Sequence, residues 1–156
     1  MNRIILGLGL FAAIGSVGTF APSAFAVDTV ISKDAPNLTA VRTKIKAKDF
    51  ASAIIDLNKI AETTQHADVY NLLGFSNRKS GDYKTAATFY SKALDFDANH
   101  KGALEYQGEL FVETGQLEKA KGNLTKLVSL CPTGCEERED LEKAIASAGA
   151  TAPKTN

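Results

Sequence analysis

The 156-residue sequence contains no tryptophan, one methionine, two cysteines and four prolines, and aromatic residues make up only 8% of it. Eighteen basic residues balance eighteen acidic residues, so the chain has no excess charge of either sign. This balance argues against the strongly basic surface that attracts nucleic acids, and we expect no nucleic-acid partner. A hydrophobic fraction of 44% nevertheless suits one small globular domain.

The sequence also lacks the motifs that mark common catalytic sites. It has no glycine-rich phosphate loop, no Ser-His-Asp ordering and no metal-binding helix motif. Carboxylates are numerous, but most of them fall on faces that we expect to be exposed to solvent. We therefore predict no catalytic residue, no enzymatic activity and no cofactor.

The first 26 residues differ from the rest of the chain. A single positive charge at Arg3 is followed by an uncharged apolar run over 4–18, and then by "TFAPSAFA" with small residues at Ala24 and Ala26. These are the three regions of a secretory signal peptide in their usual order. The apolar run is about 15 residues, whereas a membrane-spanning helix needs roughly 20. We predict cleavage after Ala26 and no stable membrane insertion afterwards.

The mature chain is predicted to be helical through most of its length. Residues 27–36 show no clear period and are expected to form a loose leader, and residues 149–156 are expected to form a flexible tail. Between them, apolar residues recur at helical three-four spacing, as in Phe50, Ile54 and Leu57. No stretch alternates with the period of two that would indicate a sheet.

An internal repeat of 34 residues organises this helical region. The repeat separates Gly74 from Gly108, and four further pairs share its spacing: Gly81 and Gly115, Ala86 and Ala120, Lys92 and Lys126, and His66 and His100. Each copy combines a leucine- or glutamine-glycine pair, a glycine turn, an alanine and a large apolar residue. This pattern resembles that of the tetratricopeptide repeat (TPR) family, in residues 67–100 and again in 101–134.

The resemblance implies an all-α, right-handed TPR superhelix of about three helix-turn-helix units. Residues 37–66 are expected to form a degenerate first unit, because "KDFASA" from Lys48 aligns with "GDYKTA" from Gly81. Residues 135–148 are expected to form a C-terminal capping helix. Gly74 and Gly108 should each allow the second helix of their own unit to approach closely, and Gly81 and Gly115 should end first helices.

The two cysteines, Cys131 and Cys135, lie between the last repeat and the capping helix. In an oxidising compartment a lone pair usually forms a disulfide, which would fasten the cap to the repeats. Free thiols, or a thiol-redox or metal-chaperone role, are alternatives. The three-residue spacer and the neighbouring Glu136 and Glu137 do not favour a reactive thiolate.

His66 and His100 could suggest a metal site, but their spacing equals the repeat. We interpret both as residues at unit boundaries and predict no metal site.

In TPR proteins, the first helices of successive units line a concave groove that holds peptides or helices. Projection of that face onto this chain nominates six partner-binding residues: Arg42, Asn71, Phe75, Arg78, Glu105 and Glu109. The groove is expected to run from basic to acidic, with Phe75 near its middle. The family's peptide-carboxylate clamp is matched at Asn71, but Phe75 and Glu109 replace other elements, so we expect no complete clamp.

These observations favour a non-catalytic protein-protein interaction module in the periplasm or outside the cell. It would bind a peptide or helix of a cell-envelope partner and be a monomer or a weak homo-oligomer. Self-assembly through the TPR surface is the main alternative.

Overall fold

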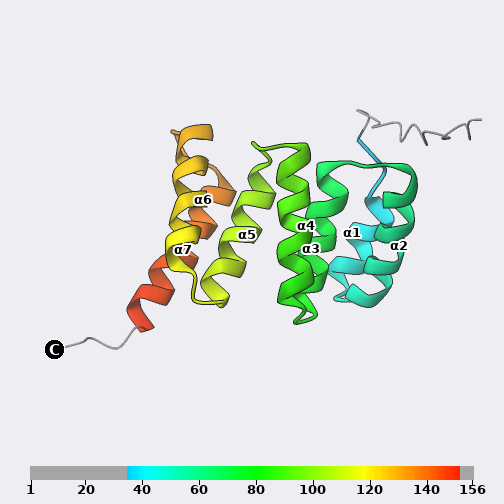
Figure 1. Cartoon of the computed structure of the whole chain (residues 1–156), viewed down its shortest axis with the longest axis horizontal. Coiled ribbons are helices and arrows are strands. Elements are labelled where there is room, and N and C mark those ends of the chain that lie inside the picture. Colours follow the sequence, from blue (N-terminus) through cyan, green and yellow to red (C-terminus); the bar gives the residue numbers. More distant parts are fainter. Residues whose placement is uncertain (1–34, 152–156) are drawn as a thin grey trace, which may run out of the picture.

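The computed structural model describes residues 35–151, which form seven α-helices arranged as three antiparallel pairs and a final helix (Figure 1). The helices are α1 (Thr39–Lys46), α2 (Phe50–Thr63), α3 (Ala67–Lys79), α4 (Tyr83–Phe96), α5 (Lys101–Glu113), α6 (Leu117–Leu130) and α7 (Glu136–Thr151). No strand occurs within this range. The all-α TPR superhelix predicted from the repeat is confirmed. The predicted signal peptide and nearly all of the predicted leader lie outside the described residues.

The turn between the two helices of each pair has the same backbone conformation. Gly81 and Gly115 have φ angles of 87° and 73°, in the left-handed region where glycine is favoured. Lys48 occupies the corresponding place between α1 and α2 with φ of 61°, and it is the one non-glycine residue with positive φ within 35–151. The first pair therefore makes the same turn without the glycine, as expected of a degenerate unit.

Polar side chains cap the helices at equivalent places. Asp49 and Asp82 begin α2 and α4, and their carboxylates accept hydrogen bonds from the backbone N–H groups of Ser52 and Thr85. His66 and His100 cap α3 and α5 through Nδ1, which accepts the N–H of Asp68 and of Ala103. The spacing of the histidines thus comes from capping. Within residues 35–151, no cluster of three His, Cys, Asp or Glu side chains is arranged to hold a metal ion.

The two helical glycines of the repeat have different neighbours. A Cβ atom placed on Gly74 would lie 2.5 Å from Cδ1 of Tyr90 on α4, the second helix of the same unit, as expected. On Gly108 it would lie 2.6 Å from Cδ2 of Leu141, so the nearest side chain belongs to α7 and not to α6 as expected. The capping helix takes that place because Leu141 is fully buried against α5 and α6.

The last helix continues further than the sequence suggested. We placed the end of the capping helix at residue 148, whereas α7 continues to Thr151; the remainder of the predicted tail lies outside the described residues. Before it, Cys131 and Cys135 bring their Sγ atoms to 2.09 Å across the α6–α7 turn. In residues 35–151, no helix combines the length and apolar character required to cross a bilayer.

Candidate functional groove

The odd-numbered helices α1, α3, α5 and α7 form one face of the molecule, and four hollows lie along it. We call this face the groove. Its hollows have volumes of about 360, 230, 300 and 540 Å³, and their lining comes almost entirely from these four helices. All six nominated residues line it: Arg42, Asn71, Phe75, Arg78, Glu105 and Glu109. The structure separates these six into three sets with different surroundings.

The first set is aromatic. The ring of Phe75 lies between those of Phe50 and Tyr106, with centroid separations of 6.3 Å and 5.0 Å. All three rings are partly exposed, and Ile45 and Leu72 extend the apolar surface around them. Large aromatic side chains that remain partly exposed in a concave site are typical anchors of protein interfaces. This aromatic row therefore provides the groove with an apolar centre.

Basic side chains surround one end of the aromatic row. Lys46, Lys48 and Lys79 line the hollow beside Phe50 and Phe75, and all three lysines are exposed. The Lys79 ammonium lies 5.4 Å from the centroid of the Phe75 ring. Lysine side chains place an apolar stem along such surfaces and keep the charge in water, so this end can contact both apolar and acidic groups.

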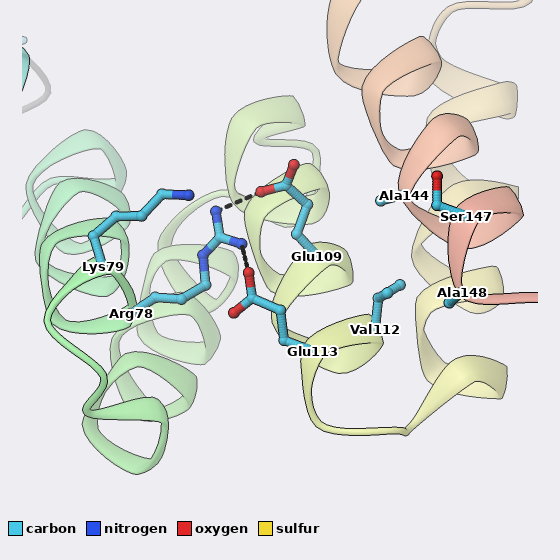
Figure 2. Close-up of a pocket in the computed structure, with 8 residues that line it drawn as sticks. All are labelled: Arg78, Lys79, Glu109, Val112, Glu113, Ala144, Ser147 and Ala148. Atoms are coloured by element: carbon cyan, nitrogen blue, oxygen red, sulfur yellow. Dashed lines mark hydrogen bonds and ion pairs between the residues drawn. The ribbon is translucent and has the colours of Figure 1, made fainter. Parts of the chain in front are cut away.

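The second set is an ion-paired cluster that joins the second and third units. Arg78 on α3 extends toward α5, where its guanidinium donates to Glu109 and, at 2.8 Å, to Glu113 (Figure 2). The whole residue is only 3% exposed. Burial alone would lower the pKa of the Arg78 guanidinium, but Tyr90, Glu109 and Glu113 raise it above its ordinary value, so the group stays charged.

This pairing changes what Arg78 and Glu109 can do for a partner. Their charges largely neutralise each other. Each therefore has less charge available for a bound partner than the sequence indicated. Both residues still line the hollow of about 360 Å³ between α3, α5 and α7. In the structure, their ion pair links α3 to α5.

The third set lies in a polar cavity where the N-terminal turns of α3, α5 and α7 meet. Five carboxyl groups line this cavity of about 300 Å³: Asp68, Glu105, Glu136, Glu137 and Asp140. Arg42 supplies one guanidinium, which lies 4.0 Å from Asp68 and is mostly exposed. Asp68 also accepts a hydrogen bond from His100 Nε2 at 3.1 Å. We call this hollow the acidic cavity.

Two buried polar side chains lie at the inner wall of the acidic cavity. Asn71 is 6% exposed, and its Oδ1 atom accepts no hydrogen bond from the described residues. Glu105 is 7% exposed and forms no hydrogen bond or ion pair with them. Burial raises the pKa of Glu105 to about 8, and the nearby carboxylates Glu109, Asp140 and Glu137 add to the increase, while Arg78 opposes it.

The raised pKa of Glu105 predicts a specific dependence of stability on pH. The folded chain keeps a proton on Glu105 up to about pH 8, whereas the unfolded chain releases it near the ordinary value of 4.5. The stabilising difference is therefore complete below pH 4.5 and is lost as the pH rises toward 8. We expect Glu105→Gln to be more stable than the parent by about 4 kcal/mol at pH 8 and nearly equal to it at pH 4.5.

Urea unfolding of parent and variant at several pH values between 4.5 and 8.5 measures this difference. Glu118→Gln is the matched control, because it removes a carboxylate that is 85% exposed on α6. We expect the control to follow the parent at every pH. A constant difference between Glu105→Gln and the parent across the range would contradict the buried, protonated carboxyl.

Several groove residues were not nominated from the sequence. Tyr106 lies at the centre of the groove and lines two of its hollows, and Asp68 lies at the start of α3. The acidic residues of α7 were not nominated either, and Glu136 and Glu137 were considered only as neighbours of Cys135. Tyr106 could have been found, because it lies between Glu105 and Glu109 on the projected helix. The contribution of α7 depends on how that helix docks against α5, which no repeat position predicts.

Stacked helix pairs with a groove along their first helices define a helical repeat protein. Residues 67–100 match the family model described as tetratricopeptide repeat. The chain therefore carries a tetratricopeptide repeat over these residues, and residues 35–151 have the fold of tetratricopeptide repeat domains.

Similar proteins of two kinds were found. The curated relatives are "Uncharacterized protein ycf37" of Pyropia yezoensis, 30% identical over 96 residues, and the protein of that name from Porphyra purpurea, 29% identical over 96 residues. The first alignment covers 55% of this chain and 54% of the relative, and the second covers 55% and 56%. The chain thus spans about half the length of the curated relatives it matches.

Solved structures with the same fold include the first TPR of Spaghetti (RPAP3) bound to the HSP90 peptide SRMEEVD, with a TM-score of 0.62 and 18% identity. That alignment covers 72% of this chain and 89% of the other. PcrH in complex with the chaperone binding region of PopD has a TM-score of 0.60 and 18% identity, covering 71% and 84%. At these identities the likeness concerns the fold.

Proposed function

We propose that this protein is a non-catalytic interaction module that holds a peptide or helix of a cell-envelope partner in the groove. The observation that carries the proposal is the aromatic row of Phe50, Phe75 and Tyr106, partly exposed in a concave face and flanked by lysines. Similar folds support it, because the Spaghetti domain is bound to an HSP90 peptide and PcrH to a region of PopD. An apolar side chain of the partner would pack on the row.

The variants that test this proposal must leave the fold intact. Charge reversal at Glu109 is unsuitable, because it would place a lysine against the buried Arg78. Phe75→Ala removes the middle ring of the row, and Lys79→Glu reverses an exposed charge beside it. Ile55→Ala is the matched control, since Ile55 is a large apolar residue of α2 that is 68% exposed and lines none of the four hollows.

We expect Phe75→Ala to weaken binding to the partner by about thirtyfold or more, because interface anchors contribute about 2 kcal/mol or more. The partner would be captured from envelope extract with the parent, and its affinity measured with each variant after a thermal-unfolding check. Lys79→Glu should weaken binding less, and Ile55→Ala should have no effect. If Phe75→Ala and Ile55→Ala bind equally well, the groove is not the binding surface. Light scattering of the purified chain separates partner binding from self-assembly.

We further propose that the protein is exported, is cleaved after Ala26 and carries a Cys131–Cys135 disulfide. The ordered charged, apolar and small-residue regions of residues 1–26 support export, and two cysteines in an oxidising compartment usually pair. Closing so short a loop would stabilise the fold by about 2 kcal/mol. Intact-mass spectrometry of the protein from its host measures both features at once. A mass that includes residues 1–26 would contradict cleavage after Ala26. A mass with two unpaired thiols would contradict the disulfide.

A further inference from the structure

The acidic cavity differs in chemistry from the aromatic row, and its residues point to a particular kind of ligand group. Its walls combine five carboxyl groups with a single guanidinium at the mouth. An anionic group entering it would meet negative charge contributed by three helices. A cation would be attracted electrostatically, and charge complementarity of this type chiefly determines specificity and the rate of encounter.

The buried side chains add a second, independent observation. Asn71 is 6% exposed, and its buried Oδ1 atom has no hydrogen-bonding partner among the described residues. Glu105 is 7% exposed and forms no hydrogen bond with them, and both residues line the cavity. Buried polar groups are nearly always hydrogen-bonded, and leaving them unpaired costs free energy. Asn71 Oδ1 is an acceptor, and the Glu105 carboxyl becomes acceptor-only once it is ionised, so a ligand that satisfies both must be a donor.

We propose that the acidic cavity receives a cationic side chain, a lysine or an arginine, of the segment bound in the groove. The ammonium or guanidinium group would donate hydrogen bonds to Asn71 Oδ1 and the Glu105 carboxylate, with Glu137 and Asp140 as outer charges. This deepens the proposed function by naming one residue type in the partner. It also reverses the polarity of a carboxylate clamp, in which the protein's cations hold the partner's anion.

The dimensions of the groove indicate where this residue stands in the partner. Tyr106 and Leu72 line both the acidic cavity and the hollow beside Phe75, so the two sites are adjacent. A bound segment that packs an apolar side chain on the aromatic row can therefore place a nearby basic side chain in the cavity. The exposed Lys46, Lys48 and Lys79 favour acidic residues toward the opposite end of the same segment.

Binding of a cation is coupled to ionisation of Glu105. A protonated carboxyl is a poor partner for a cation, so binding favours loss of the Glu105 proton and becomes stronger as the pH rises from 6 to 8.5. Other groups that face the cavity or act on Glu105 are Arg42 from α1, Asp68 and Arg78 from α3, His100 before α5, Tyr106 and Glu109 from α5, and Glu136, Glu137 and Asp140 from α7. The Glu105→Gln variant separates the contribution of Glu105 from theirs.

The test titrates the purified full chain, labelled with ¹⁵N and ¹³C, with Nα-acetyl-arginine methylamide and Nα-acetyl-lysine methylamide. The neutral isostere Nα-acetyl-citrulline methylamide is the matched probe. We expect the cations to shift the Asn71 side-chain amide resonance and to lower the pKa of Glu105. At pH 8.5, Glu105→Gln should weaken cation binding by about tenfold, as expected for a hydrogen bond to a charged group. Glu118→Gln should bind like the parent.

Three outcomes would overturn the proposal. They are equal binding of the citrulline probe, equal effects of Glu105→Gln and Glu118→Gln, and binding of the anion Nα-acetyl-glutamate methylamide at Asn71 in place of the cations. Phe75 does not line the cavity, so Phe75→Ala should leave cation binding unchanged. Loss of partner binding in Phe75→Ala with no cation response in the parent would therefore reject this inference and keep the proposed function.

Discussion

Gly74→Ala is expected to destabilise the protein by about 3 kcal/mol, the upper end for inserting a methyl group into a packed core. The new Cβ would lie 2.5 Å from Cδ1 and 2.6 Å from Cε1 of Tyr90. Tyr90 is fully buried between α3, α4 and α5, so its ring cannot turn away without moving a helix. The cost should therefore exceed the gain of about 1 kcal/mol that alanine brings to a helix.

Urea unfolding measured alongside Gly122→Ala provides the control. Gly122 lies in α6, and a Cβ atom there would meet nothing within 4 Å. The same chemical change should stabilise the protein at this position by about 1 kcal/mol. Tyr90→Leu combined with Gly74→Ala should recover part of the loss, because the smaller side chain leaves room. Equal effects at Gly74 and Gly122 would show that the two helices do not approach as closely as described.

Arg78→Met is expected to destabilise the protein by about 3 kcal/mol, the lower end for breaking a buried ion pair. Methionine keeps much of the apolar volume but removes the charge that pairs with Glu109 and Glu113. These carboxylates would then lose the cation with which both are paired. The lower end applies because the Glu109 and Glu113 side chains are 25% and 37% exposed, so water screens part of the loss.

Lys79→Met is the matched control, because Lys79 is adjacent to Arg78 but exposed. This substitution should change the free energy of unfolding by less than about 0.5 kcal/mol. Adding Glu109→Gln and Glu113→Gln to Arg78→Met should recover stability by removing the unpaired charges. Urea unfolding of these variants, with thermal unfolding as a second measurement, gives the coupling free energy between Arg78 and the two glutamates. An Arg78→Met variant as stable as Lys79→Met would mean that the ion pairs do not hold α3 against α5.

The fold was predictable because its signals are local and occur twice. Glycines at φ angles near 80° and helical apolar spacing carry information within a few residues, and a 34-residue period repeats it. The first unit could be placed although Lys48 replaces the glycine, because the residues after it kept the pattern. The neighbour of Gly108 was mispredicted for the opposite reason. Whether α6 or α7 reaches that glycine depends on long-range packing of Leu141, which no local pattern encodes.

The sequence predicted which face of the helices forms the groove. It did not predict which charged side chains on that face are paired or buried. The helical period determined which side of α1, α3 and α5 faces the groove, so all six nominated residues line its hollows. Their partners were not predictable. Arg78 and Glu109 are 31 positions apart, and Asp68 and His100 are 32 apart, so each contact requires the units to stack first. Burial of a side chain also requires the units to stack first, because the side chain loses its water only when a neighbouring helix covers it.

The sequence by itself therefore determined the repeat, the helices, their turns and the side of the helices on which the nominated residues lie. These follow from backbone preferences and periodicity. Only the tertiary structure decided which charges neutralise one another and which remain available. It paired Arg78 with two glutamates, left Glu105 and Asn71 without partners in the acidic cavity, and brought the acidic start of α7 beside them. Charge and hydrogen bonding depend on distance and exclusion of water, and both are properties of the packed helices.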